Sequence, residues 1–285
     1  MSVRVRLLVA GHSLQAEWFS RRSGGLRRVR FPATFALLEV PGQAPVLFDT
    51  GYSARFFSAT GPFPQRLYRL LLPVAFSPAE AATAQLGALG VSPDAVGTVV
   101  LSHLHGDHIA GLRDFPAARI VRAGPALPPE VEPGARPRAR VALRTTRHGF
   151  LPELLPPDLL ARSTDAAALP MVATGLPGFG AGHDLFGDGR AVLVPLPGHA
   201  PGHLGLWLPR TQGRPVFLVG DACWHREAFL SGDLPPRPVL AMLGEPAASA
   251  ATVERLAALA RSRPDVLVVP SHCAASVAAA QEALG

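Results

Sequence analysis

Three histidines and an aspartate stand within six consecutive positions of the sequence, as His103, His105, Asp107 and His108. They follow residues 97–101, an apolar β-branched run that predicts a buried strand. Side chains two positions apart cannot share a helix face, so His103 and His105 converge only on a tight loop. Nitrogen and oxygen donors without thiolate are typical of zinc, iron or manganese sites. We interpret this segment as half of a metal site.

The other candidate ligands also follow predicted strands. They are His199 after a strand at residues 191–196, Asp221 after one at 215–219, and His272 after one at 265–269. Strand ends that gather at one edge of a sheet form a preorganised floor for a site. Asp107 and His108 are neighbours that point apart, which favours two metals over one. The sequence therefore predicts a dinuclear centre at a sheet edge.

Two further segments are predicted around this framework. Residues 52–76 are apolar without clean periodicity, and we expect either a flap over the substrate or a packed helix and loop. As a flap, its aromatic side chains would line an apolar pocket, namely Tyr52, Phe56, Phe57, Phe63 and Tyr68. Residues 124–180 are rich in proline and predict an irregular connector or cap.

The remaining pattern is typical of an α/β chain. Strands are expected at residues 3–10, 33–40, 45–51, 118–122 and 204–208, a hairpin turn at 185–189, and helices at 78–90, at 252–260 and at the C-terminus. Asp49 stands where the strand at 45–51 ends in a turn, so it either caps that turn or serves the site.

The size and composition predict one globular domain over residues 1–285. Large α/β domains reach this length, and no low-complexity linker interrupts the sequence. Apolar residues make up 48% of the chain and charged residues 17%, a balance that supports a buried core and excludes a disordered chain.

The positive charge does not indicate a nucleic-acid partner. The formal net charge is +6, but the sequence contains no Lys and no Asn, and it has 28 Gly and 30 Pro. This pattern is typical of compositional bias rather than of a phosphate-binding face. We expect a small-molecule substrate, with a homodimer as one open option.

The chain shows no sign of a membrane or an oxidising compartment. No apolar run approaches the ~18 residues of a membrane span. Residues 1–10 lack the apolar core and cleavage site of a signal peptide. With two cysteines, Cys223 and Cys273, a disulfide framework is not expected. These features favour a cytoplasmic location.

Five ordered motifs resemble those of the metallo-β-lactamase superfamily. They are Phe48-Asp-Thr-Gly51, His103-x-His-x-Asp-His108, Pro197-Gly-His199, Gly220-Asp221 and Pro270-Ser-His272. The resemblance implies an α/β fold, the four-layer αβ/βα sandwich, in which two mixed β-sheets face each other with helices outside. It also implies a ligand set, in which His103, His105 and His199 hold the first metal, Asp107, His108 and His272 hold the second, and Asp221 bridges them.

This arrangement implies hydrolysis. Two divalent cations about 3.5–4 Å apart share a hydroxide that attacks a carbonyl, while the cations stabilise the oxyanion and the leaving alkoxide. We expect two zinc ions, with iron, manganese or cobalt as alternatives. The expected catalytic residues are Asp107, Asp221 and Trp224. By the resemblance Asp49 orients the ligands, and His203 is expected to have a structural or orienting role rather than to bind metal.

Residues 220–224 look most like the N-acyl-homoserine lactonase branch. Those enzymes have a tyrosine three residues after the bridging aspartate, where its hydroxyl contacts the substrate carbonyl; this chain has Trp224 there. Indole donates a hydrogen bond but supplies no phenol. Trp224 is therefore expected either to form a wall of an apolar pocket, with weak assistance to the reaction, or to serve in packing.

The predicted function is a dinuclear metal hydrolase that opens a lactone or cleaves a carboxylic ester with an apolar acyl part. The alternatives among hydrolases are a glyoxalase II-like thioesterase and a phosphoesterase or phosphotriesterase. Two different classes share the motif or the fold, namely a mononuclear iron persulfide dioxygenase and a non-catalytic binding protein. The complete ligand set argues against both of these classes.

Overall fold

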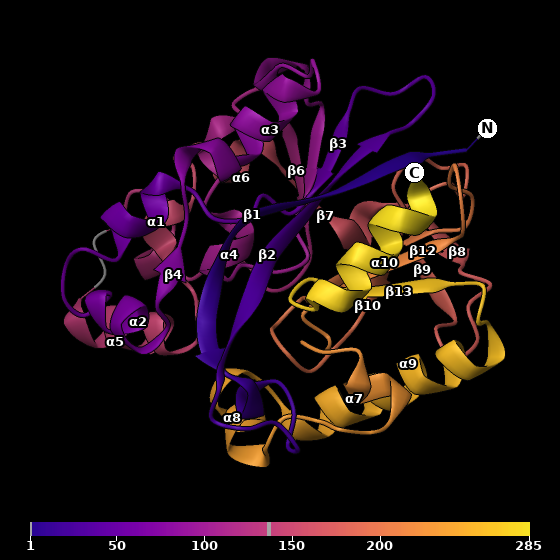
Figure 1. Ribbon diagram of the computed structural model, residues 1–285. Helices are drawn as coiled ribbons and strands as arrows, with labels where there is room; N and C mark the ends of the chain where they lie inside the picture. Colours follow the sequence, from indigo (N-terminus) through magenta and orange to yellow (C-terminus); the bar gives the residue numbers. More distant parts are fainter. Residues whose placement is uncertain (1, 136–137) are drawn as a thin grey trace.

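Two mixed β-sheets lie against each other in the computed structural model, which describes residues 2–135 and 138–285 (Figure 1). The first sheet has the order β4-β1-β2-β3-β5-β6-β7. Its strands are β1 (Arg4–Ala16), β2 (Arg28–Glu39), β3 (Val46–Phe48), β4 (Val74–Ala75), β5 (Thr98–Val100), β6 (Arg119–Arg122) and β7 (Ser163–Asp165). The strands from β3 to β7 in this order run parallel, and the others pair antiparallel.

The second sheet has the order β13-β12-β11-β10-β9-β8. Its strands are β8 (Met171–Ala173), β9 (Ala181–Asp184), β10 (Val192–Pro195), β11 (Leu204–Leu208), β12 (Val216–Gly220) and β13 (Leu267–Pro270). Only β12 and β13 pair in parallel among the described strands of this sheet.

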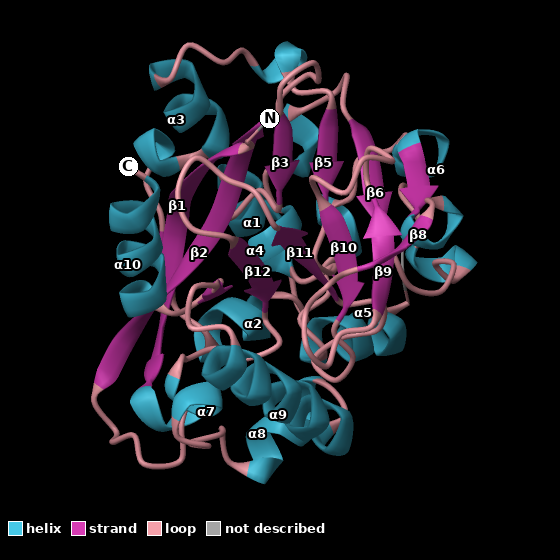
Figure 2. Cartoon of the chain, turned by 90° about the vertical axis from the view of Figure 1, so that its right-hand side faces the viewer, coloured by secondary structure: helices cyan, strands magenta, loops and turns pink. Residues whose placement is uncertain are grey.

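The helices cover the outer faces and the ends of the two sheets (Figures 1 and 2). They are α1 (Ala54–Ala59), α2 (Arg66–Leu71), α3 (Ala82–Ala88), α4 (Gly106–Ile109), α5 (Ala139–Arg147), α6 (Leu159–Arg162), α7 (Glu227–Leu230), α8 (Arg237–Leu243), α9 (Pro246–Ser262) and α10 (Ala274–Leu284). Figure 2 shows α7, α8 and α9 gathered at one end of the strands. No helix in the described part of the chain has the length and apolar character needed to cross a membrane.

The central strands of the second sheet are apolar on both faces because each face packs against another layer. Along β12, Val216 and Leu218 belong to the core between the two sheets, whereas Phe217 and Val219 belong to the outer core under α7 and α9. The alternation follows from the two-residue period of a strand. A strand covered on both sides reads as a continuous apolar run, which is why these strands were predictable.

Most predicted strands are confirmed close to their expected bounds. The strands β3, β5, β6, β10 and β11 lie inside the predicted ranges, and β12 and β13 end one residue later. The predicted helix at 78–90 begins with a single 3₁₀ turn whose capping box joins Ser77 and Glu80, and it continues as α3. The helix α9 begins at Pro246, before the predicted residue 252.

Residues 124–180 are more regular than predicted. They contain α5 and α6, and they supply β7 to the first sheet and β8 to the second. The strand β7 is polar, and β8 is an apolar run of only three residues, too short to predict a strand. The strand β1 is also longer than residues 3–10, because its hairpin with β2 extends past the core toward α8 (Figure 1). The backbone N–H of Arg22, at the hairpin tip, donates to the Leu234 carbonyl at 2.9 Å.

Candidate metal centre

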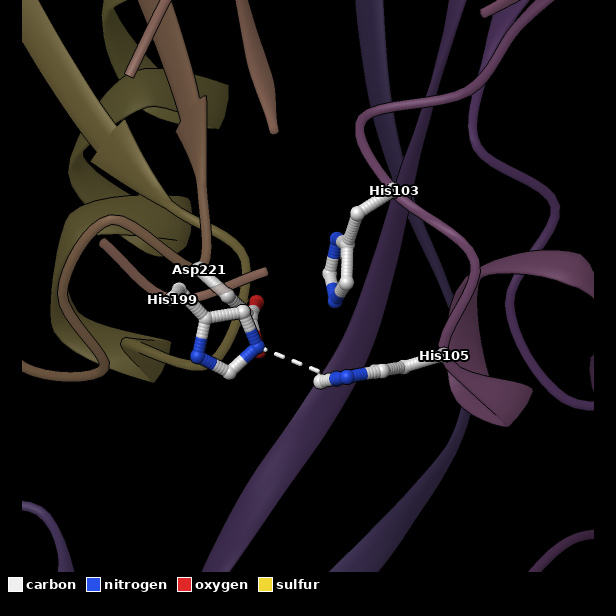
Figure 3. Close-up of side chains that lie close together, drawn as sticks. All are labelled: His103, His105, His199 and Asp221. Carbon is white, nitrogen blue, oxygen red and sulfur yellow. Dashed lines mark hydrogen bonds and ion pairs between the residues drawn. The ribbon is translucent and has the colours of Figure 1, made fainter. Parts of the chain in front are cut away.

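Seven ligand-type side chains from four strand ends meet at one edge of the two sheets. His103, His105, Asp107 and His108 follow β5, and His199, Asp221 and His272 follow β10, β12 and β13. None of the seven is more than 9% exposed. Figure 3 shows His103 and His105 reaching from one side toward His199 and Asp221 on the other. The structure thus brings together every residue that was predicted as a ligand.

The side chains form two groups, each able to hold one cation. The ligand atoms of His103, His105, His199 and Asp221 lie within 4.8 Å of one another, as do those of Asp107, His108 and His272. His105 Nδ1 and His199 Nε2 face each other at 3.0 Å. Two neutral imidazole nitrogens at this distance share a proton or offer both lone pairs to one metal.

The carboxylate of Asp221 lies between the two groups. Its Oδ1 is 3.3 Å from His108 Nε2, and its Oδ2 is 3.0 Å from His272 Nε2, both in the second group. The same Oδ2 is 3.4 Å from His199 Nε2 in the first group. One carboxylate therefore reaches ligands of both groups, which is the placement that a bridging ligand requires.

Asp49 lies directly under the site and orients His108. Among the described non-glycine residues it alone has a positive φ, 62°. This backbone conformation aims its buried carboxylate at the loop after β5, where Oδ1 accepts the Ser102 N–H at 2.8 Å and Oδ2 accepts the Ser102 hydroxyl at 2.7 Å. The same Oδ2 lies 2.8 Å from His108 Nδ1. Asp49 is thus more than a turn cap, because it holds the ring of a candidate ligand.

Three histidines use one ring nitrogen for the protein and present the other to the site. His108 Nδ1 donates to Asp49, His272 Nδ1 donates to the Pro32 carbonyl at 2.7 Å, and His103 Nδ1 lies 3.0 Å from the Ser102 hydroxyl oxygen. A proton fixed on Nδ1 leaves the lone pair on Nε2, as in metal-bound histidines.

Buried atoms with unused hydrogen-bonding capacity point to a cation. Among the described residues, His103 Nε2 is buried without a hydrogen-bond partner, and His108 Nε2 and Asp221 Oδ1 are buried and 3.3 Å apart but form no hydrogen bond. Such groups are costly in an apolar interior. All three act as acceptors when the histidines are neutral, and a divalent cation supplies the missing positive charge. The residues present therefore fit two divalent metal ions.

Gly220 allows Asp221 to enter the site. Its φ is +53°, and a Cβ at this position would lie 2.8 Å from His203 Nε2. His203 needs this space because its Nε2 accepts the backbone N–H of Asp221 at 3.0 Å. Its nearest contact with the site is therefore the backbone of a candidate ligand, as expected for an orienting residue.

Burial favours the neutral form of the three imidazoles in the first group. Burial lowers the pKa of His105 to about 4, against the opposing effect of Asp107 and Asp221. Burial also holds the pKa of His103 and of His199 well below the ordinary value, with neighbouring imidazoles adding to the effect. Neutral imidazoles are the form that binds metal.

The second group is a network of opposite charges. Burial disfavours the charged form of His272, but Asp221 and Asp107 outweigh it and raise the pKa to about 10. Burial would likewise raise the pKa of Asp107, yet His108 and His272 hold it at about 2. A cation at this position would replace the protons of the two histidines as the partner of the carboxylates.

Trp224 contacts two candidate ligands of the first group. Its indole N–H donates to Asp221 Oδ2 at 3.0 Å, and its ring packs edge-on against His199 with centroids 5.7 Å apart. Both ligands and Trp224 border a small cavity of about 20 Å³. Trp224 therefore touches the centre, and its N–H is engaged by a carboxylate.

A larger cavity of about 790 Å³ opens beside His105 and Gly198. Its wall includes residues from 104–105, 122–131, 144–150, 195–203 and 244–245, and none from 52–76. Tyr52 and Phe56 are 1% and 0% exposed and lie in the core outside the first sheet. For these two residues the pocket assignment is corrected to packing, since their rings are covered by neighbouring side chains.

The other aromatic residues of the predicted flap are less covered. Phe57 and Tyr68 are half-buried, and Phe63 is 75% exposed. Phe56 contacts both Phe57 and Tyr68 edge-on, at centroid distances of 5.7 and 5.5 Å. A pocket lined by Phe57, Phe63 and Tyr68 stays a prediction.

Two supports of the site were not predicted. Ser102 links Asp49 to the ring of His103, and the Pro32 carbonyl fixes His272. Ser102 was within reach of sequence reasoning, because it is a polar residue directly before the first ligand. The Pro32 contact joins residues 240 positions apart and leaves no local signal.

The geometry agrees with comparisons to known proteins. The model of the Metallo-beta-lactamase superfamily matches residues 29–272. A probable metallo-hydrolase of Mycobacterium tuberculosis is 34% identical over 182 residues, which cover 64% of this chain and 54% of that protein. An N-acyl homoserine lactonase of Azorhizobium caulinodans is 27% identical over 158 residues, covering 53% and 52%. The chain thus spans about half the length of these curated relatives.

Solved structures show the same fold. An N-acyl homoserine lactone hydrolase with N-hexanoyl-L-homoserine at its catalytic metal centre superposes with a TM-score of 0.71 at 20% identity, over 98% of this chain and 97% of that one. The dizinc lactonase AidC gives 0.58 at 16% identity, over 95% and 88%. At these identities the likeness establishes the architecture, and the chemistry rests on the side chains of this chain.

Proposed function

Because this chain belongs to the metallo-β-lactamase superfamily, we propose that it is a dinuclear metal hydrolase that opens a lactone or cleaves a carboxylic ester with an apolar acyl part. The observation that carries the proposal is the position of Asp221. Its two oxygens lie within 3.4 Å of nitrogens from both groups. When bound, two divalent cations supply a water activated near neutral pH and polarise the substrate carbonyl.

The chain's own residues hold and orient this chemistry. His103, His105 and His199 would bind the first cation, Asp107, His108 and His272 the second, and Asp221 both. Asp49 keeps the proton of His108 on Nδ1, and the Pro32 carbonyl does the same for His272. Preset ring orientations of this kind reduce the reorganisation needed when the ligands bind metal. Zinc suits this donor set best, with iron, manganese or cobalt as substitutes.

The lactonase relatives support an ester or lactone substrate. Matched proteins named as N-acyl homoserine lactonases come from Azorhizobium caulinodans and Rhizobium radiobacter. The large cavity beside His105 has walls that include Leu104, Leu127, Val131 and Phe150, which would accept apolar parts of a substrate. Its volume of about 790 Å³ lies in the ordinary range for small-molecule sites.

A substrate panel with controlled metal content tests the proposal. The protein is loaded in turn with zinc, manganese, cobalt and iron, and it is assayed on acyl-homoserine lactones, carboxylic esters, thioesters and phosphotriesters. We expect turnover of a lactone or carboxylic ester that chelation abolishes and metal restores. Turnover confined to thioesters or phosphoesters would favour those alternatives, and oxygen consumption with a persulfide would favour the dioxygenase. No hydrolysis by any metal form would overturn the proposal.

A further inference from the structure

The large cavity beside His105 is lined in part by Arg122, whose buried Nε donor has no partner among the described residues. Arg122 is the last residue of β6, whose Val121 pairs with Val100 of β5 just before the ligand loop. Arg122 and a residue of the metal centre, His105, line the same cavity. A ligand that fills the cavity would therefore reach from the metal centre to a guanidinium.

The hydrogen bonding of Arg122 is incomplete. Its Nε is buried without a partner among the described residues, and its Nη1 donates to the Pro125 carbonyl at a long 3.4 Å. No ion pair between described residues includes Arg122. A guanidinium carries five N–H donors in a planar fork, and leaving buried donors unmet is costly. The buried Nε thus lacks an acceptor, which a carboxylate in the cavity would supply.

The other charges around the cavity leave room for one negative charge. Arg144 also lines it, but this residue lies on the rim and faces Glu130 at 4.0 Å, with both side chains largely exposed. Glu245 also lines the cavity and is exposed. The apolar lining of the same cavity includes Leu104 and Phe150. This combination matches a short apolar chain that ends in a monoanion.

We propose that this cavity binds substrates whose non-reacting part carries a carboxylate, and that Arg122 receives that carboxylate. A planar carboxylate meets the guanidinium fork with two parallel hydrogen bonds, which Arg favours over Lys. The inference rests on the proposed hydrolase function and adds a substrate class to it, namely monoesters of dicarboxylic acids or lactones that bear a carboxylate.

A pair of substrates that differ in one group tests this assignment. The zinc-loaded protein is assayed on the p-nitrophenyl ester of hexanoic acid and on the p-nitrophenyl monoester of adipic acid, which has the same chain length and a terminal carboxylate. We expect the adipate monoester to have the higher kcat/KM. In Arg122→Gln this preference should fall roughly 10- to 100-fold, mainly through KM, because one charge-assisted contact is lost. The rate on the hexanoate ester should change little.

Arg119→Gln is the matched control, since Arg119 is an exposed residue at the other end of β6 and does not line the cavity. It should keep the preference, and Arg122→Lys should restore only part of it. Binding of adipate against hexanoate, measured by calorimetry, gives a readout independent of turnover, and Arg122→Gln should remove the difference. Hydrolysis of both esters with equal kcat/KM, or a preference that survives in Arg122→Gln, would overturn the carboxylate assignment alone. Hydrolysis of neither ester would count against the hydrolase proposal, while the calorimetry would still decide the role of Arg122.

Discussion

The indole N–H of Trp224 donates a 3.0 Å hydrogen bond to Oδ2 of Asp221, the carboxylate that lies between the two metal groups. A donor held by this carboxylate is not free for a substrate carbonyl. The indole also packs against His199, a ligand of the first group. Trp224 is thus placed to position candidate ligands as well as to line the small cavity beside them, and its N–H is engaged differently from the hydroxyl of the lactonase tyrosine.

Replacing Trp224 with Phe should weaken metal binding. Phe keeps an aromatic ring against His199 but loses the hydrogen bond to Asp221, and loss of such a support typically lowers metal affinity about 10- to 100-fold. Competition with a chromophoric chelator measures the affinity. Trp207→Phe is the control, because Trp207 donates to the Thr174 carbonyl away from the site. Equal zinc affinity in the Trp224→Phe protein and the wild type would show that the hydrogen bond does not position the ligand.

Asp49→Asn should damage the second metal group. The amide retains the shape of the carboxylate but removes the charge that faces His108 Nδ1. Its NH₂ group accepts no hydrogen bond, so it would leave unmet either the Ser102 N–H or the donors that now share Oδ2. We expect a fall of about 10- to 100-fold in affinity for the second metal. Chelator titration of Asp49→Asn beside Ser102→Ala measures it, and the alanine variant should lose less. An unchanged second binding step would exclude Asp49 as a support of His108.

Gly220→Ala should be far more damaging than a glycine replacement at an open turn. Both Gly220 and Gly187 have positive φ, but a Cβ at Gly187 has nothing within 4 Å, whereas one at Gly220 would lie 2.8 Å from His203 Nε2. We expect Gly187→Ala to cost about 1 kcal/mol of unfolding free energy through backbone strain alone. Gly220→Ala should cost more and also lower metal content, as judged by urea unfolding and elemental analysis. Similar losses in the two variants would contradict this role of Gly220.

Chelated protein should lose stability as the pH rises. In the protein without bound metal, Asp221 and Asp107 raise the pKa of His272 from 6.5 to about 10 against the effect of burial. A folded-state pKa above the unfolded value contributes stability that is fully present below about 6.5 and is lost as the pH rises through about 10. Urea unfolding of the chelated protein between pH 7 and 10 measures this trend. His272→Gln should show a flatter dependence, and a wild-type curve that rises with pH would refute the charge network.

The sequence was sufficient to single out the candidate ligands because they lie in the loops that follow four buried strands. The strands β5, β10, β12 and β13 are buried on both faces and give apolar runs, so His103, His199, Asp221 and His272 stand out at their ends. The pattern also favoured the family whose fold the structure shows. The local sequence therefore indicated both the sheet edge at which the site lies and the side chains that could bind metal.

The sequence was not sufficient where a role depends on packing between distant segments. Tyr52 and Phe56 have the aromatic side chains expected in an apolar pocket, yet neighbouring residues bury both of them. The cavity beside His105 is lined by residues from 104–105, 122–131, 144–150, 195–203 and 244–245, whose meeting no local pattern encodes. The turn after β12 folds the indole of Trp224 back onto Asp221, a contact that the local sequence does not encode.

The number of metal ions bound per chain tests the central claim most directly. Elemental analysis of the purified wild-type protein should give two divalent ions per chain. The Asp221→Ala variant should contain fewer, because Asp221 reaches both groups. Asp184→Ala is the control, since Asp184 is buried in β9 and binds backbone N–H groups away from the centre. A wild-type chain that binds at most one ion, or an Asp221→Ala protein that keeps two, would contradict the dinuclear centre.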